Sequence, residues 1–212
     1  MTNDIWTEPT RRGILVGGAA LTLAGCGGNL IGPPSPAPQL YVLQPEFGAL
    51  ADSPNVPWQL VVSVPAAPAS LDTERIALER APNTMDYYAN SQWTDRAPLL
   101  LQSLLVEAFE KSGRIAAVGR ETAGIRADYV LETEIRDFEA YYAVPDAAPN
   151  VRANITAKLL GALSHEIAGT MQSVHQAQAA ANDMTSITAA FTKAAGAAVE
   201  EIVGWTLRAR SR

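Results

Sequence analysis

The stretch VRANITAKL, residues 151–159, decides the fold. Its odd-numbered positions, from Val151 to Leu159, are apolar, and its even-numbered positions, from Arg152 to Lys158, are polar. Because successive side chains of a β-strand point to opposite faces, this pattern predicts a strand with one buried face and one face in water. Residues 129–135 alternate in the same way, and 166–177 is expected to pair back as the next strand after a turn at 163–165.

A helix is predicted over residues 98–111, between the short strands expected at 73–79 and 115–118. Its leucines recur at intervals of three and four, and Pro98 suits a first helical turn. We expect Thr94 or Asp95 to cap its N-terminus and Gly113 to follow its last residue.

A second helix is predicted at the C-terminal end of the chain. It is expected to begin at Asn182 or Asp183, both good capping residues, and to reach Trp205 after about six turns. Short strands are expected at 39–44, 58–64, 73–79 and 115–118. The predicted fold class is therefore α/β: a single domain with a mixed, largely antiparallel sheet covered by at least two packed helices.

One aromatic-rich segment, RAPNTMDYYANSQWTDRAP at residues 80–98, lies between these elements. It places Tyr87, Tyr88 and Trp93 among turn-forming residues. Aromatic side chains in a loop are typical anchors for a protein partner. The alternative is that Tyr87 and Trp93 are core residues wedged between the sheet and the first helix.

The N-terminal segment has the features of an export signal. Arg11 and Arg12 precede an uncharged, mildly apolar run at 13–25, which is too short to cross a bilayer as a helix. The arginine pair fits both a twin-arginine signal and an ordinary secretory signal. We therefore interpret residues 1–25 as a signal peptide.

The only cysteine, Cys26, directly follows this run. The sequence Leu23-Ala24-Gly25-Cys26 resembles the lipobox of bacterial lipoproteins. That resemblance implies cleavage between Gly25 and Cys26 and attachment of acyl chains, such as palmitate, to the cysteine. Several acyl chains hold a protein on a membrane almost permanently.

Residues 26–38 read as a lipidated, Gly/Pro-rich tether, and residues 39–210 as the folded domain. Gly27 occupies the position where aspartate is the familiar signal for retention in the inner membrane of enteric bacteria. We therefore expect an outer-membrane anchor, with the domain facing the periplasm.

Charge and composition argue against several kinds of partner and chemistry. The formal net charge is −6, and the chain has no run of lysine and arginine, so its charge argues against nucleic acid as a ligand. His165 and His175 are expected on the surface, because no cysteine or carboxylate pair accompanies them at metal-ligand spacing. No motif pairs a nucleophile with a base. We expect no catalytic residues, no metal and no cofactor.

The aromatic segment and its neighbours resemble a known family. Tyr87-Tyr88-Ala89, then Trp93, then the leucine-rich helix ending at Ser112-Gly113 are similar to the auxiliary lipoproteins of ABC-type transport, the PqiC-like family that accompanies MCE-domain proteins. Many members of the family carry arginine at the position of Gln92. A salt bridge made by that arginine in other members is therefore not expected in this chain. The resemblance covers roughly residues 38–207.

The resemblance implies a non-enzymatic component of a lipid or hydrophobic-compound transport system. Its partners would be an MCE-domain protein and, through it, the permease and ATPase in the inner membrane. Two alternatives remain at this point. An anchored lipid-binding carrier would need an apolar cavity of roughly several hundred Å³ between sheet and helices. An anchored hydrolase would need a clustered nucleophile and base.

Overall fold

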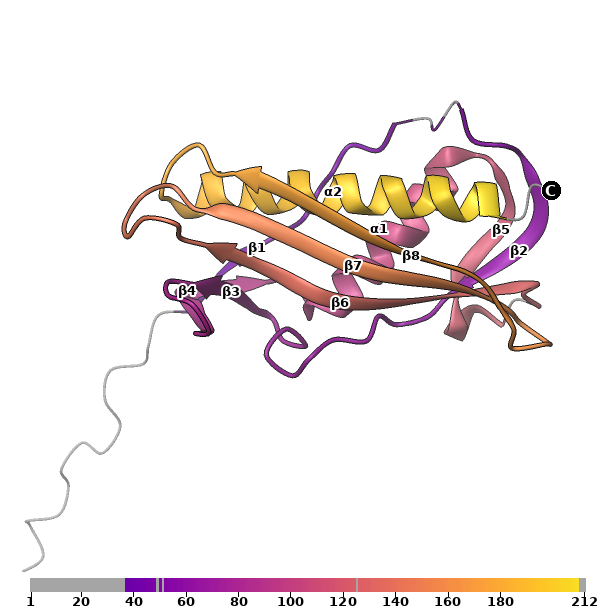
Figure 1. Cartoon of the computed structure of the whole chain (residues 1–212), viewed down its shortest axis with the longest axis horizontal. Helices are drawn as coiled ribbons and strands as arrows, with labels where there is room; N and C mark the ends of the chain where they lie inside the picture. The colour runs from indigo at the N-terminus through magenta and orange to yellow at the C-terminus, as the bar shows by residue number, and fades with distance from the viewer. Residues whose placement is uncertain (1–36, 49, 51, 125, 210–212) are drawn as a thin grey trace, which may run out of the picture. The chain divides into compact units, whose positions relative to one another are not determined.

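Three long antiparallel strands, β6 (Tyr129–Tyr141), β7 (Asn150–Gly161) and β8 (Ile167–Gln178), form the broadest part of the sheet (Figure 1). This computed structural model describes residues 37–48, 50, 52–124 and 126–209. The apolar positions of β7, from Val151 to Leu159, are at most 1% exposed. The prediction of a strand with one buried face is therefore confirmed.

The sheet forks along β6. The first residues of β6 pair in parallel with the end of β2 (Val56–Val62), and its last residues pair in parallel with the end of β3 (Arg75–Glu79). On one branch, β5 (Ile115–Arg120) lies beside β2; on the other, β4 (Asp86–Trp93) and then β1 (Gln39–Tyr41) continue from β3. Within the described residues, this gives an eight-stranded mixed sheet whose longest pairings are antiparallel, as predicted.

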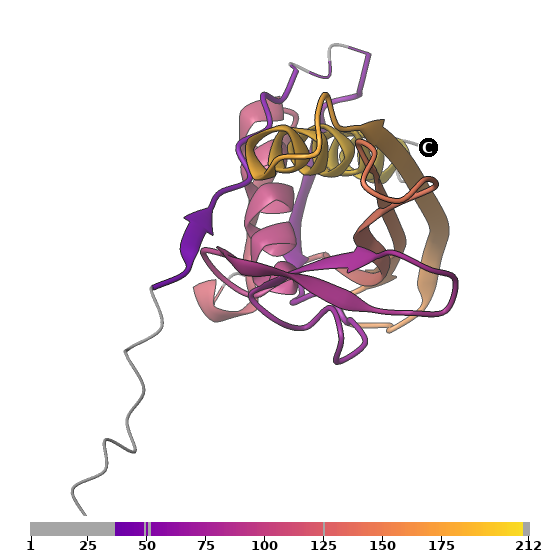
Figure 2. The same cartoon turned by 90° about the vertical axis from the view of Figure 1, so that its left-hand side faces the viewer.

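The helices α1 (Ala97–Ser112) and α2 (Met184–Ala209) lie on the same side of the sheet, which curls around them (Figure 2). A short 3-10 helix, η1 (Glu121–Ala123), follows β5. Asp183 caps α2, because its Oδ1 accepts a hydrogen bond from the Ser186 backbone N–H at 2.9 Å. Gly113 ends α1 in the left-handed conformation, with φ of 61°. Both predictions are confirmed.

The predicted cap of α1 is wrong. The N-cap residue is Arg96, which makes no side-chain capping bond, and the helix begins at Ala97. The helix begins too late for either predicted residue: Thr94 lies two positions before the N-cap, with its N–H bonded to the Tyr41 carbonyl at 3.1 Å. The Asp95 Oδ1 accepts a hydrogen bond from the Arg96 N–H at 2.8 Å instead of from the first turn of the helix.

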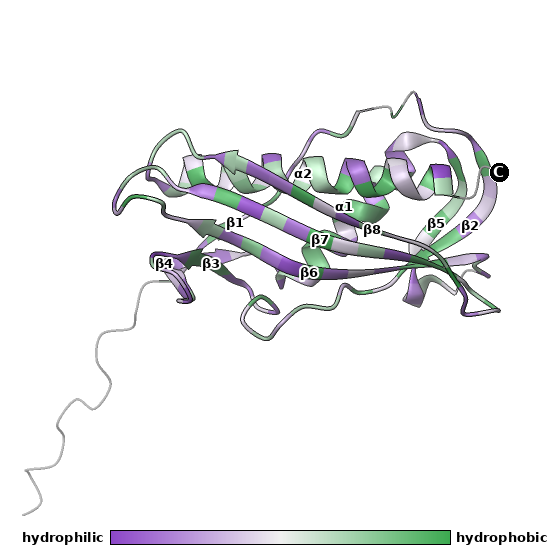
Figure 3. Ribbon diagram, viewed as in Figure 1, coloured by the Kyte–Doolittle hydropathy of each residue, from purple (hydrophilic) through white to green (hydrophobic). Residues whose placement is uncertain are grey.

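The core fills the space between the helices and the inner face of the sheet. Trp93, Phe138 and Phe191 stack there edge to face or at a tilt, with ring centroids 5.0–6.1 Å apart. Figure 3 shows the hydrophilic and hydrophobic residues alternating along β6, β7 and β8, so that only one side of each strand joins this core.

Three stretches differ from the sequence-based expectations. Residues Asp86–Trp93, expected to be a loop, form β4. The strand predicted at 129–135 continues to Tyr141, because a β-bulge between Ile135 and Asp137 inserts one residue and breaks the alternation. The strand expected at 58–64 ends at Val62, so Val64 lies beyond the end of β2 and is 45% exposed.

No helix among the described residues is long and apolar enough to cross a membrane. The predicted signal peptide, Gly25, Cys26 and most of the tether fall outside the described residues.

Candidate docking surface

The face of β6, β7 and β8 that points away from the helices is polar. The even-numbered residues of β7 lie on this face, and the strand register places polar residues of β6 and β8 beside them. We call this surface the outer sheet face; it comprises Glu132, Glu134, Arg136, Asp137, Glu139, Tyr141, Arg152, Asn154, Thr156, Lys158, Gln172 and Gln176.

Arg152 is the centre of an ion-pair network on this face. It donates two hydrogen bonds to Glu139 Oε1, from Nη2 at 2.7 Å and from Nε at 3.1 Å. Asp137 and Glu79 lie 3.6 and 3.8 Å from the guanidinium. Three carboxylates therefore surround one arginine, whose charge offsets part of their mutual repulsion.

Glu139 is almost fully buried although it lies on the outer sheet face, with 3% of its surface exposed. Burial raises the pKa of this carboxyl, and the hydrogen bonds and charge of Arg152 offset part of the rise. The carboxyl also accepts a hydrogen bond from the Phe138 backbone N–H at 2.7 Å. Hydrogen bonds from Arg152 and from the Phe138 N–H thus fix the Glu139 carboxyl from two sides, and this holds the network in one geometry.

Hydrogen bonds extend the network across all three strands. Asn154 donates to Asp137 at 2.6 Å, and Gln172 donates to Asn154 at 2.8 Å. Farther along, Arg136 binds Thr156 at 2.9 Å and Glu134 at 3.1 Å. The outer sheet face therefore presents oriented amides, hydroxyls and charges, and these are groups that exchange hydrogen bonds with a protein partner.

The three aromatic residues singled out from the sequence do not form one cluster. Trp93 is 1% exposed and packs in the core against Phe138 of the sheet and Phe191 of α2, so it is a core residue and not an exposed anchor. Tyr87 is half-buried: its hydroxyl donates to the Ser70 carbonyl at 3.1 Å, and the Arg75 guanidinium lies 3.5 Å from its ring centroid.

Tyr88 belongs to a different contact. Tyr142 donates its hydroxyl proton to Asn182 Oδ1 at 2.9 Å, so the Tyr88 hydroxyl, 2.9 Å away, donates to the Tyr142 oxygen. Burial and this hydrogen bond raise the pKa of Tyr88. The chain of three residues joins β4 to the loop after β6 and to the start of α2.

Ser173, His175 and Glu201 meet where β8 contacts α2. Glu201 Oε2 lies 2.6 Å from Ser173 Oγ and 2.9 Å from His175 Nε2. The serine hydroxyl thus donates to the carboxylate rather than to the histidine, and Ser173 is fully buried. An activated nucleophile needs its base within hydrogen-bond reach and access to substrate, so this cluster is suited to joining β8 to α2.

The space between sheet and helices is well packed. A cavity there, lined by residues that include Leu43, Leu101, Phe138 and Ala195, measures only about 10 Å³. That volume is about the minimum for one water molecule. Among the described residues, no group of three or more histidine, cysteine, aspartate or glutamate side chains is placed to hold a metal ion.

The Arg152–Glu139 pair was not found from the sequence. Arg152 was recognised only as a polar position of its strand, and Glu139 lay outside the strand predicted at 129–135. The register that sets these residues opposite each other depends on the bulge at Arg136. The alternation of Asp137, Glu139 and Tyr141 with Phe138 and Ala140 was the available signal.

Comparison with known proteins gives a match over most of the chain. The sequence model for the ABC-type transport auxiliary lipoprotein component matches residues 41–203. The crystal structure of a protein from Xanthomonas campestris superimposes with a TM-score of 0.76 at 32% identity, over 81% of this chain and 95% of that one.

Two further similarities are weaker. An uncharacterized protein of known structure has a TM-score of 0.60 at 12% identity, over 79% of this chain and 97% of that one, and so shares the fold. An uncharacterized protein of Bradyrhizobium diazoefficiens is 26% identical over 150 residues. That match spans 71% of this chain but only 40% of the Bradyrhizobium protein.

Proposed function

Because the chain belongs to the family of ABC-type transport auxiliary lipoprotein components, we propose that it is the lipid-anchored accessory of an MCE-type ABC system that transports lipids or other hydrophobic compounds. The family is one of transport auxiliary components and not of enzymes. In the proposed role, the domain docks on a periplasmic part of the transporter, an MCE-domain protein, and performs no covalent chemistry.

The outer sheet face is the observation that carries this proposal. It spans three strands, lies opposite the helices, and has most of its charges paired around Arg152 and Arg136, with Glu132 and Lys158 at one end as exceptions. A partner that docks over the paired charges does not have to desolvate lone charges, which is the costly part of burying a polar surface. Neutral groups such as Gln172 and Gln176 remain to exchange hydrogen bonds with the partner.

Anchoring is the second part of the proposal. Residues 1–25 would be removed as a signal peptide, with cleavage between Gly25 and Cys26, and Cys26 would carry the lipid. Residues 26–38 would then tether the domain at 39–210 to the membrane. Gly27 favours the outer membrane, with the domain in the periplasm.

The two alternative functions have less support. A carrier that encloses lipid needs a cavity of roughly several hundred Å³, and the cavity between sheet and helices is about 10 Å³. A hydrolase needs an accessible nucleophile, and the Ser173 hydroxyl is buried against Glu201. Docking requires neither feature.

The test is a pull-down of the tagged full chain from detergent-solubilised envelopes, in parallel for the wild type and Cys26→Ser. We expect the wild type to recover an MCE-domain protein, identified by mass spectrometry. The variant should be found in the soluble periplasmic fraction and should recover less of that partner. A wild-type sample that brings down no transporter component would contradict the docking role, and a variant that stays in the membrane would contradict the anchor.

A further inference from the structure

A recess opens at the fork of the sheet, where the chain leaves β2 and bows away from β6. The Ser63 N–H donates to the Leu131 carbonyl at 3.1 Å, and the Ala66 N–H donates to the Thr133 carbonyl at 2.9 Å. Between these two anchor points, Val64 and Pro65 stand away from the strand. The resulting pocket has a volume of about 300 Å³, which is within the range of small-molecule sites.

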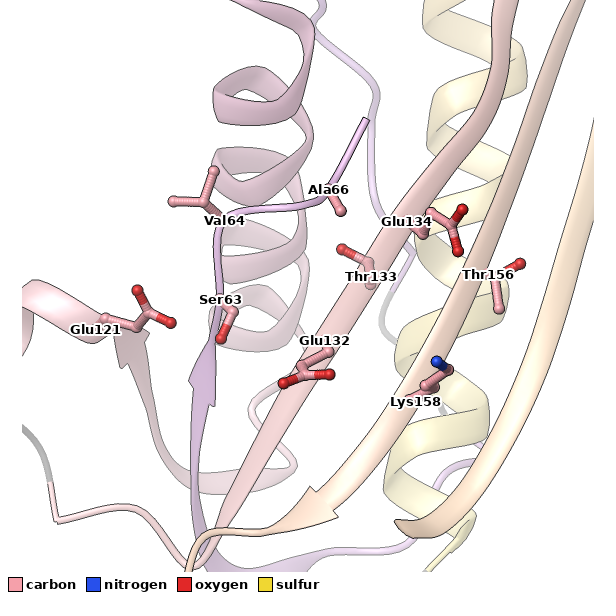
Figure 4. Close-up of a pocket in the computed structure, with 9 residues that line it drawn as sticks. All are labelled: Ser63, Val64, Ala66, Glu121, Glu132, Thr133, Glu134, Thr156 and Lys158. Atoms are coloured by element: carbon pink, nitrogen blue, oxygen red, sulfur yellow. The ribbon is translucent and has the colours of Figure 1, made fainter. Parts of the chain in front are cut away.

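The pocket has an acidic side and a basic side. Figure 4 shows the carboxylates of Glu121 and Glu132 on either side of Ser63, with the Lys158 ammonium on the other side of Glu132. Glu132 and Lys158 are opposite each other in the β6–β7 register, yet they form no ion pair. Among the described residues, Glu121, Glu132 and Lys158 have no salt-bridge partner, whereas Glu134 is paired with Arg136.

We propose that this pocket binds a small zwitterion of the phosphoethanolamine type. Its ammonium group would lie between Glu121 and Glu132, and its phosphate would face Lys158 and the Thr156 hydroxyl. Because the Glu132 and Lys158 side chains diverge, the ammonium and phosphate groups of the ligand have to lie apart. The two-carbon spacer of phosphoethanolamine provides that separation. In an α-amino acid, by contrast, the charged groups share one carbon.

The same chemistry occurs in two sources, a free phosphoethanolamine metabolite and the headgroup of a phospholipid. In the second case only the headgroup enters, because a pocket of about 300 Å³ does not hold two acyl chains as well. Four pocket residues, Glu132, Glu134, Thr156 and Lys158, also belong to the outer sheet face. The inference does not depend on the docking role, because binding of the ligand is measured on this chain alone.

The test is isothermal titration calorimetry on the detergent-solubilised full chain. One arm uses phosphoethanolamine, and the other uses short-chain dihexanoyl phosphatidylethanolamine. Ethanolamine, inorganic phosphate and dihexanoyl phosphatidylglycerol serve as probes that carry only part of the zwitterion. We expect saturable binding of at least one complete zwitterion and binding weaker by about tenfold or more for each partial probe.

Variants assign the binding to the pocket. Glu132→Gln and Lys158→Met should each weaken binding of the zwitterion by about tenfold or more, because each removes one charged partner. Glu110→Gln on α1 and Lys193→Met on α2 change the same charges at exposed positions elsewhere and should leave the affinity unchanged. Thermal melts of all four variants check that they fold.

Binding of phosphoethanolamine alone identifies a soluble metabolite, and binding of the short-chain lipid identifies a headgroup. Absence of both, or affinities that Glu132→Gln and Lys158→Met leave intact, would overturn the proposal.

Discussion

Arg152 and Glu139 face each other across the β6–β7 ladder and are joined by two hydrogen bonds to one carboxylate oxygen, on a face of the sheet that is otherwise open to water. The arginine side chain is 31% exposed and the glutamate side chain 4%. The pair therefore connects the surface network to a nearly buried charge.

Replacing Arg152 by methionine is expected to destabilise the fold strongly. The change leaves Glu139 buried without its counter-ion, and breaking a pair of this kind costs about 3 kcal/mol. Urea denaturation at neutral pH measures the loss. The matched control is Arg136→Met, whose partner Glu134 is 46% exposed, and its cost should be below about 1 kcal/mol.

Acidification should relieve part of the Arg152→Met defect. Burial already raises the pKa of Glu139, and without Arg152 that pKa rises further. A carboxyl with a higher pKa in the folded state gains protons on folding, so the free energy of unfolding increases as the pH falls through that pKa. A defect of equal size at neutral and acidic pH, or one that a second change, Glu139→Gln, does not reduce, would contradict this account.

Tyr142→Phe tests the contact between β4 and the start of α2. It removes the acceptor of the Tyr88 hydroxyl and the donor to Asn182, so it should lower the free energy of unfolding by about 1–3 kcal/mol. Tyr141→Phe is the control, because it removes one exposed hydrogen bond to Gln176 and should cost less than about 1 kcal/mol. Equal losses in the two variants would show that the hydrogen-bonded chain Tyr88–Tyr142–Asn182 stabilises the fold no more than the single exposed bond of Tyr141 does.

Gly196→Ala should destabilise the protein although alanine is the better helix former. A Cβ at this position of α2 would lie 2.7 Å from Pro45 Cβ, so the segment after β1 would have to move. Overpacking costs about 1–3 kcal/mol and the gain in helix propensity is about 1 kcal/mol, so we expect a net loss of up to about 2 kcal/mol. Thermal melts measure the change; a higher melting temperature than the wild type would mean that Pro45 moves away at little cost.

Glu201→Gln should change how stability depends on acid. Burial raises the pKa of Glu201, but hydrogen bonds from Ser173 and His175 outweigh it, so the pKa lies below its ordinary value. A carboxyl of this kind stabilises the fold above the ordinary glutamate pKa, and that contribution is lost as the pH falls through the folded-state pKa.

Because the Glu201 side chain is 47% exposed, the effect should be below about 1 kcal/mol. The variant should be slightly less stable than the wild type at neutral pH, and the difference should shrink at acidic pH. Urea titrations of both proteins over this pH range measure it, and a constant difference would contradict the role given to the Ser173 and His175 bonds.

Local patterns were enough to predict the elements that dominate the fold. The alternation from Val151 to Leu159 and the helical spacing after Asp183 both survive in the structure, because each reflects burial of one face. Asp183 and Gly113 act as predicted, since the cap of a helix end is a local hydrogen-bonding requirement.

The features that were missed depend on contacts between distant residues. The bulge at Arg136 hides the second half of β6, and without it the register of Glu139 opposite Arg152 is unknown. Strand β4 contains Asn90 with φ of 52° and several turn formers, and it is a strand only because β3 and β1 pair with it on both sides. The pocket at the fork likewise joins residues of β6 and β7 to a segment about 70 and about 90 positions earlier in the chain, respectively.

The measurement that tests the proposed docking role most directly is site-specific photo-crosslinking in intact cells. A photo-reactive amino acid is placed at Gln172 or at Gln176, both exposed on the outer sheet face, and at Glu110, exposed on α1, as the control. The account predicts that the two sheet positions crosslink to an MCE-domain protein, identified by mass spectrometry, and that Glu110 does not. Crosslinks to that protein from Glu110 alone, or no crosslink to a transport component from either sheet position, would contradict it.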